Sequence, residues 1–319
     1  MTEVVPGVHR LAAPLGDRFV CIFLVVGSAS AAVIDTGVAG SPDAVLTGAL
    51  AALEVDVAHI LVTHADVDHS GGLAATRRLA PQALAMCHPL DRPLVDSVER
   101  LINDRYREFR DIHEIEPDTE FCDWVRANDD GGAVDDVIDP PAHIDLGDRR
   151  LVVLHTPGHT PGHLTVVDEL TRTAIVADAV MAGAVPDAAG ESAFAPTYRY
   201  PADYLRSCAV LRELDPARLL CSHYPVVEGR AAVAEFLDAS ESFAARVEQE
   251  IFDVLDTAAR PLPAADVIAA VAPRVRTWDA SMDMTLAQPV VGHLEDLVSR
   301  RLARVLPGVP TTFLAARPS

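Results

Sequence analysis

The sequence contains no lysine, so all 26 of its basic residues are arginine, and they are outnumbered by 47 Asp and Glu residues. The formal net charge of -21 surrounds the protein with a negative field, which repels polyanions on approach. From residue 243 onward, eight arginines face nine acidic residues, so this part also lacks the basic face that grips nucleic acid. The charge therefore argues against nucleic acid as a partner.

Cysteine pairs are also lacking. The five cysteines are odd in number, widely spaced and form no CxxC motif, which excludes a disulfide framework and a thiolate zinc site. The first residues show no charged segment followed by an apolar run, and no stretch approaches the ~18 apolar residues of a membrane span. We therefore expect a soluble cytoplasmic protein with no membrane partner.

The first part of the sequence alternates between strands and helices. Apolar runs at 19–27 and 31–36 predict a hairpin, and Ser41 followed by proline predicts the start of a helix. A short strand at 59–63 and a helix at 73–79 follow. The order β-β-α-β-α indicates the layered α/β class.

Two further segments differ in character. Residues of about 93–128 carry apolar side chains at helical spacing, which predicts a helical insertion, either a lid or an interface. A second block of strands is predicted at 151–154, 163–167, 173–177 and 219–222.

The C-terminal part returns to helical patterns. Helices are predicted at 247–255, 264–271 and 288–302, before a strand at 311–314. We expect a catalytic domain at 1–240 and a small winged-helix-like domain at 241–319.

The segment 63–72 concentrates metal donors directly after a predicted strand. His64, Asp66, Asp68 and His69 lie within six residues. Such carboxylates repel one another and are costly to desolvate unless a cation binds them. If the segment is extended, alternation directs His64, Asp66 and Asp68 to one side. The alternative is a solvated acidic loop.

Three distant residues strengthen the metal interpretation. His159 lies in the loop TPGHTPGH after a strand, Asp178 follows the strand at 173–177, and His223 follows the strand at 219–222. Binding sites of layered α/β proteins gather at such strand ends.

The motifs THxDxDHxGG, TPGHTPGH and the strand-end Asp and His, together with Asp35-Thr36-Gly37, resemble the metallo-β-lactamase superfamily over residues 5–230. The resemblance implies an αββα sandwich and a dinuclear metal site. It implies that His64, Asp66 and His159 hold the first ion, that Asp68, His69 and His223 hold the second, and that Asp178 bridges them. It also implies that Asp35 and His163 support the ligands.

The superfamily commonly has histidine where this chain has Asp66. The resemblance favours zinc, whereas a carboxylate is a harder donor that suits iron or manganese. The implied mechanism is attack by a metal-bridging hydroxide, with Asp68 orienting it and Asp178 fixing the metals.

The function that we expect is hydrolysis of an ester-like bond, a thioester or lactone, in a small or carrier-linked acyl substrate. Cleavage of phosphodiesters or RNA, and a non-hydrolytic diiron oxygenase or redox protein, are the alternatives. Tyr198, Arg199 and Tyr106 are candidate substrate contacts. A homodimer would give the insertion or the C-terminal domain a role as an interface.

Overall fold

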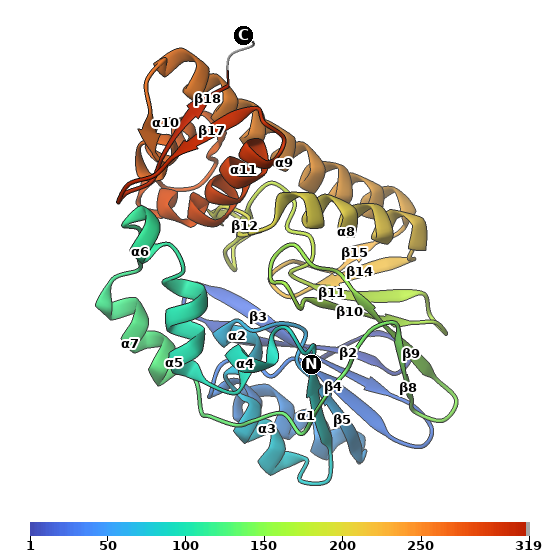
Figure 1. The fold of residues 1–319 in the computed structure, drawn as a ribbon. Helices are drawn as coiled ribbons and strands as arrows, with labels where there is room; N and C mark the ends of the chain where they lie inside the picture. Colours follow the sequence, from blue (N-terminus) through green and yellow to red (C-terminus); the bar gives the residue numbers. More distant parts are fainter. Residues whose placement is uncertain (317–319) are drawn as a thin grey trace.

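The computed structural model describes residues 1–316 and has two β-sheets packed face to face, with helices on both outer sides (Figure 1). The buried side chains between the sheets come from both of them, for example Phe23 and Leu61 from the first sheet and Val166 and Ile175 from the second. The structure therefore confirms the predicted αββα sandwich.

The first sheet has seven strands in chain order. Its first four strands are antiparallel neighbours, and its last four are parallel neighbours joined by crossovers. The strands are β1 (Thr2–Val5), β2 (Val8–Leu15), β3 (Arg18–Val26), β4 (Ala31–Ile34), β5 (Val57–Leu61), β6 (Leu84–Cys87) and β7 (Asp136–Val137).

Short helices in the crossovers cover the outer face of this sheet: η1 (Pro42–Leu46), α1 (Thr47–Leu53), α2 (Val67–Ser70) and α3 (Leu73–Leu79). The helix at 73–79 has the predicted bounds. The helix starts after Ser41 as predicted, with proline in its first turn, but the Ser41 side chain does not cap it: its Oγ accepts a hydrogen bond from Val38 N at 3.1 Å, before the helix. The chain enters this helix through the π-helical turn η1 instead.

The second sheet has six strands in the order β15-β14-β11-β10-β9-β8. Only one pair of neighbours, β11 and β14, is parallel, and it is connected by helix α8 (Pro201–Leu214); the other neighbours in this sheet are antiparallel. The strands are β8 (Ala142–Asp145), β9 (Arg150–His155), β10 (Leu164–Asp168), β11 (Thr173–Ala177), β14 (Arg218–Cys221) and β15 (Val227–Glu228); the separate hairpin is β12 (Val185–Pro186) and β13 (Ser192–Phe194).

The insertion lies between β6 and β7 and is helical, as predicted. Leu101 and Ile102 are buried against the outer face of the first sheet, whereas Phe109 joins the core outside the second sheet. The insertion thus links the two outer layers. Its elements are α4 (Arg92–Val95), α5 (Val98–Arg100), η2 (Leu101–Tyr106), α6 (Arg110–His113) and α7 (Thr119–Ala127).

The C-terminal part contains helices and a three-stranded sheet in the order β16-β18-β17. Helix α9 runs without a break across residue 240, where we expected a domain boundary, and its Leu237 and Phe243 share one core with Val176 of the second sheet. The winged-helix identity stays a prediction. The elements are α9 (Arg230–Ala258), β16 (Leu262–Pro263), α10 (Ala264–Val275), η3 (Ala280–Leu286), α11 (Ala287–Ser299), β17 (Ala303–Leu306) and β18 (Thr312–Ala315).

The helical insertion and the C-terminal part are also in direct contact. Thr311 N donates to Ile112 O at 2.9 Å, and the rings of His113 and Phe313 stack 5.8 Å apart. Helix α6 accordingly lies beside the C-terminal unit in Figure 1. Among residues 1–316, no helix has both the length and the apolar character that a membrane crossing requires.

Candidate metal centre

The first metal-binding segment begins where β5 ends, and the buried carboxylate of Asp35 fixes it there. Asp35 accepts hydrogen bonds from Thr63 N at 2.7 Å, Thr63 Oγ1 at 2.9 Å and His69 Nδ1 at 2.8 Å. It therefore holds both the start of the segment and one of its histidines, which is the supporting role that we expected.

The segment 64–69 is not extended throughout. Asp66 has extended dihedral angles, but helix α2 starts at Val67 and places Asp68 and His69 in a helical turn. The expectation that His64, Asp66 and Asp68 share one side is therefore wrong, because alternation stops where the helix begins. Asp68 faces His69 and His223 instead, with its carboxylate oxygens 4.0 Å and 3.5 Å from their Nε2 atoms.

The second loop joins β9 to β10 and carries His159. Its ring Nδ1 lies 3.0 Å from the carbonyl of Thr197, which can only accept, so Nδ1 carries a proton. Asp91 ties this loop to the first one: its carboxylate accepts from Ala65 N at 3.0 Å, Thr160 Oγ1 at 2.6 Å and Gly162 N at 2.7 Å.

Asp178 and His223 come from the ends of β11 and β14. These strands are parallel, so their carboxyl ends meet at one edge of the sheet. His223 Nδ1 lies 3.0 Å from the carbonyl of Phe19, and its Nε2 lies 3.4 Å from Asp178 Oδ2. His163 accepts from Asp178 N at 3.3 Å and contacts Thr156 Oγ1 at 3.1 Å, so both of its ring nitrogens are used within the protein.

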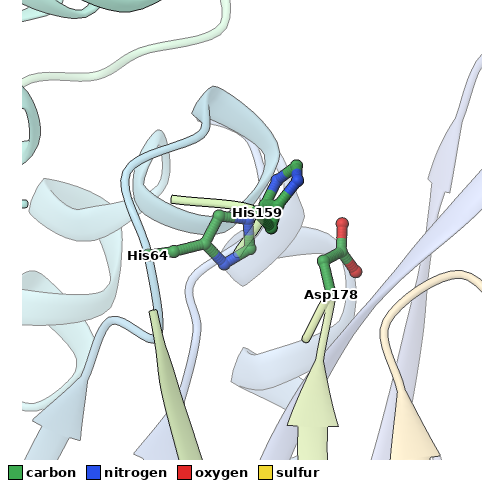
Figure 2. Close-up of side chains that lie close together, drawn as sticks. All are labelled: His64, His159 and Asp178. Carbon is green, nitrogen blue, oxygen red and sulfur yellow. The ribbon is translucent and has the colours of Figure 1, made fainter. Parts of the chain in front are cut away.

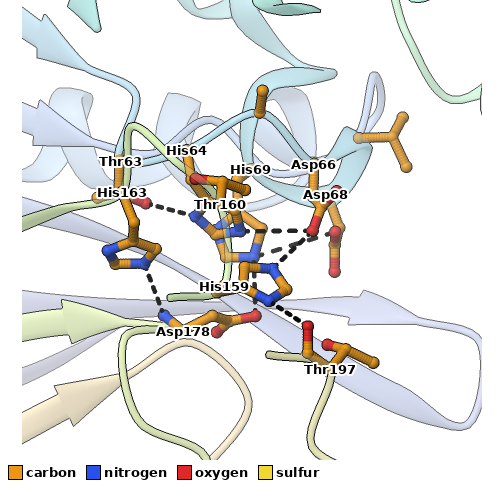
Figure 3. A network of polar contacts seen from close by, with 12 residues as sticks. Thr63, His64, Asp66, Asp68, His69, His159, Thr160, His163, Asp178 and Thr197 are labelled. Carbon is orange, nitrogen blue, oxygen red and sulfur yellow. Dashed lines mark hydrogen bonds and ion pairs between the residues drawn. The ribbon is translucent and has the colours of Figure 1, made fainter. Parts of the chain in front are cut away.

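These elements bring six of the predicted ligands together in two donor groups. The His64 group consists of His64, His159 and Asp178, and the His69 group consists of Asp68, His69 and His223. Within each group the donor atoms lie within 4.8 Å of one another. Figure 2 shows the His64 group, and Figure 3 shows this group in one polar network with Asp68 and His69 of the other group.

The donors fit a metal because several buried atoms face the centre without a partner. Within the described chain, His64 Nε2, His69 Nε2 and Asp178 Oδ1 have no hydrogen-bond partner. Unpaired buried polar atoms are costly, and a cation bound among these donors would satisfy such atoms. Asp178 Oδ2 lies 3.6 Å from His69 Nε2 and 3.4 Å from His223 Nε2. Those separations suit donors that share one ion, since bonds of about 2.0–2.2 Å place tetrahedral ligands about 3.3–3.6 Å apart.

The protein field also suits a cation. Burial would raise the pKa of Asp178, but His223 and His69 hold it well below its ordinary value. Burial would lower the pKa of His69, yet Asp35, Asp178 and Asp68 raise it well above its ordinary value. Burial and the neighbouring histidines lower the pKa of His64, which keeps that ring neutral and able to donate its lone pair.

Asp66 is the predicted ligand that lies outside both groups. The guanidinium of Arg105 binds it in a bidentate manner, with Nε 2.6 Å from Oδ1 and Nη2 2.8 Å from Oδ2. Burial alone would raise the pKa of Asp66, but Arg105 and His159 hold it well below its ordinary value. Arg105 itself has only 5% of its side chain exposed.

The three candidate substrate contacts differ in their distance from the metal centre and in whether their polar atoms are already bound. Tyr198 is fully buried and its hydroxyl lies 3.0 Å from His293 Nε2, so its side chain offers no free atom to a substrate. Arg199 is ion-paired with Glu108 at 3.1 Å and Glu295 at 2.7 Å. Tyr106 lies at the site, where its hydroxyl accepts from Val67 N at 3.0 Å.

Arg105 and Asp91 are site residues that the sequence analysis missed. Both come from the insertion or its start, far along the chain from the donors that they contact. The sequence did offer one indication. Asp66 adds a negative charge to a buried site, and such a charge is costly unless a cationic group lies nearby. The sequence offers 26 arginines and no pattern that selects one of them.

Comparison with known proteins agrees with this architecture. A sequence model of the metallo-beta-lactamase superfamily matches residues 15–223, whereas no protein of curated function matches the chain. A metallo-beta-lactamase family protein from Thermus thermophilus is 21% identical, with a TM-score of 0.76 over 98% of this chain and 100% of that one. A beta-lactamase domain protein from Burkholderia ambifaria is 17% identical, with a TM-score of 0.70 over 99% of this chain and 93% of that one.

An archaeal metallo-beta-lactamase superfamily protein from Sulfolobus tokodaii is 20% identical, with a TM-score of 0.56 over 73% of this chain and 85% of that one. At these identities the structural likenesses concern the fold alone. The superfamily match spans more than half of the chain and includes both donor groups. The chain therefore belongs to the metallo-beta-lactamase superfamily.

Proposed function

We propose that this protein is a metal-dependent hydrolase that cleaves an ester-like bond, a thioester or lactone, in a small or carrier-linked acyl compound. The observation that carries the proposal is the His69 group together with Asp178, whose donors converge at separations of 3.4–4.0 Å with Nε2 of His69 left unpaired. Zinc is the ion that the superfamily favours, and iron and manganese are the alternatives to test.

The residues of the site would have two roles: some would bind the ion, and Asp68 would also accept a proton. A divalent ion, when bound, lowers the pKa of a coordinated water to about 7 and polarises a carbonyl. Asp178 and the His69 group would hold the ion. Asp68 has the more accessible carboxylate, with 19% of its side chain exposed against 8% for Asp178, so we assign to it the further role of orienting an attacking water and accepting its proton.

The charges around the site favour an uncharged reacting bond. The two arginines described at the site, Arg105 and Arg199, are both neutralised by carboxylates. With the net charge of -21, this arrangement leaves a phosphodiester no unpaired charge on either of these two arginines, which disfavours an anionic substrate. A thioester or lactone carbonyl needs only the polarising ion and an oriented water. Tyr106 supplies an aromatic wall for an acyl chain.

A substrate panel tests the proposal. Metal-stripped protein is reloaded separately with zinc, manganese and iron, and is assayed against acyl thioesters, lactones and a bis-phosphodiester. Turnover of a thioester or lactone is expected, and preferential cleavage of the phosphodiester would overturn the substrate class. Asp178→Ala should abolish turnover with the circular dichroism spectrum retained, while Asp187→Ala, in the exposed turn after β12, should leave turnover unchanged.

A further inference from the structure

Arg105 lies where the first ion of a dinuclear site would need its ligands. The superfamily resemblance assigns that ion to His64, Asp66 and His159. Arg105 covers both oxygens of Asp66, as described above, and its Nη1 also donates to the carbonyl of His159 at 3.3 Å. A resident cation thus faces the ligands that a metal ion would need.

The donor atoms of this set are occupied by one another as well. His159 Nε2 lies 3.2 Å from Arg105 Nη2 and 2.7 Å from Asp66 Oδ2. Whether Nε2 accepts from Arg105 or donates to Asp66, it is engaged within the protein. A separation of 2.7 Å is also shorter than the about 3.3–3.6 Å between two ligands at the corners of a tetrahedral ion site. Of the three expected donors, only His64 Nε2 has no partner among the described residues.

The His69 group shows the opposite arrangement. Its carboxylate and imidazole atoms lie 3.5–4.0 Å apart, which leaves room for an ion between them. Within residues 1–316, no arginine forms a hydrogen bond or ion pair with Asp68, His69 or His223, whose ionic contacts are with one another and with Asp35 and Asp178. The two halves of the centre therefore differ in what compensates their negative charge.

The position of Arg105 is fixed by the fold rather than by one ion pair. The neighbouring Tyr106 binds Val67 N, next to Asp66, and the preceding Leu101 and Ile102 are fully buried. On the other side, Glu108 is paired with Arg199. A metal ion would have to displace the guanidinium of Arg105. The residues on both sides of Arg105 are anchored, and its side chain has almost no exposed surface.

We propose that Arg105 takes the place of the first metal ion, so that this protein binds one divalent ion tightly, in the His69 group with Asp178. The fixed positive charge neutralises Asp66 and weakens binding of a second ion by direct repulsion. The inference rests on the proposed metal-dependent function, and it revises the expectation of two bound ions to one.

Metal titration of the intact, metal-stripped protein tests this directly, with zinc and then manganese as the probe and calorimetry and elemental analysis as the readouts. We expect one tight ion per wild-type chain. In Arg105→Met, the freed Asp66 and His159 should bind a second ion at least about tenfold more tightly than in the wild type, the size of effect known for residues that support metal ligands.

Two control variants separate charge from packing. Arg105→Lys keeps the positive charge and should keep the one-ion stoichiometry. Arg100→Met removes an exposed arginine of the same insertion, paired with Asp104, and should behave as the wild type.

The wild-type titration decides the matter even if Arg105→Met does not fold. Two ions of similar affinity in the wild type would overturn the role of Arg105 while leaving the proposed hydrolase intact. Failure of the wild type to take up any ion tightly would overturn the proposed function itself, and the inference with it.

Discussion

The carboxylate of Asp35 and the imidazole of His69 meet at 2.8 Å, with both side chains fully buried. This bond orients the ring so that Nε2 points to Asp68, Asp178 and His223. Supporting carboxylates of this kind fix the tautomer of a ligand and strengthen it as a donor. The metal affinity of the centre should therefore depend on a residue that does not itself bind the ion.

Asp35→Asn is expected to weaken metal binding about 10- to 100-fold, because a neutral amide supports the ring less well. Competition with a chromophoric chelator measures the change. Asp43→Asn, whose carboxylate is 68% exposed, serves as the control. Unchanged affinity in Asp35→Asn would show that His69 is oriented by its packing alone.

Asp91 joins the two ligand-bearing loops and has no exposed surface. Burial raises its pKa despite the hydrogen bonds from Thr160, Ala65 and Gly162, which favour the charged form. Asp91→Ala leaves these three donors without an acceptor, and each unsatisfied buried group costs about 1–3 kcal/mol.

We therefore expect Asp91→Ala to lower the free energy of unfolding by about 3 kcal/mol or more, measured by urea denaturation of the metal-free protein. Asp91→Asn keeps the shape and one acceptor, so its loss should be clearly smaller. Equal losses in the two variants would mean that the charge of Asp91, rather than its hydrogen bonds, connects the loops.

The sequence predicted those parts of the site that are local in the chain. His64 to His69 form one dense motif, and His159, Asp178 and His223 each follow a strand that apolar runs reveal, so the layered α/β class and these donors could be expected. The αββα sandwich was expected from the resemblance to the superfamily. The position of the domain boundary, which we expected at 240, is harder to predict from the sequence. Helix α9 continues through it because Leu237 and Phe243 belong to one apolar face, which periodicity alone cannot divide.

What the sequence could not supply depends on tertiary contacts. Asp66 looks like a ligand in the motif, and only the folded insertion shows that Arg105, 39 residues away, holds it. The direction of Asp68 was also missed, because the start of α2 at Val67 depends on how the loop is anchored. Ion pairs between distant residues leave no periodic pattern in a single sequence.

Gly158 lies beside His159 in a backbone conformation with a φ of +142°. A Cβ at this position would lie 2.5 Å from Tyr204 Cα and 2.7 Å from Tyr204 N, in the first turn of α8. Main-chain atoms of a helical turn cannot move aside cheaply where the side chain, that of Tyr204, is fully buried. Gly158→Ala should therefore shift the loop, lower stability by about 1–3 kcal/mol or more and disturb the contacts of His159.

Thermal unfolding measures this loss, and Gly48→Ala provides the matched control. Gly48 lies in helix α1 with no atom within 4 Å of an added Cβ, so alanine there should be neutral or slightly stabilising. A Gly158→Ala protein as stable as the wild type would show that α8 can yield at Tyr204.

Glu248 of α9 connects two parts of the C-terminal unit. His293, with Nδ1 3.6 Å from Oε2, and Arg300, with Nη2 2.6 Å from Oε1, lower the pKa of Glu248 from 4.5 to about 2. A carboxyl whose pKa is lower in the folded state stabilises the fold above its unfolded pKa, and this contribution disappears as the pH falls through the folded pKa.

Glu248→Gln should accordingly lower the melting temperature by about 1–3 °C at pH 7, a small effect because the pair is partly solvent-exposed. The difference from the wild type should be constant down to about pH 4.5 and shrink toward zero near pH 2. Calorimetric scans of metal-free protein across this range measure it, with Glu235→Gln on an exposed position of the same helix as the control. A difference that persists unchanged at low pH would assign the loss to packing of the side chain, because protonation of Glu248 removes only its charge.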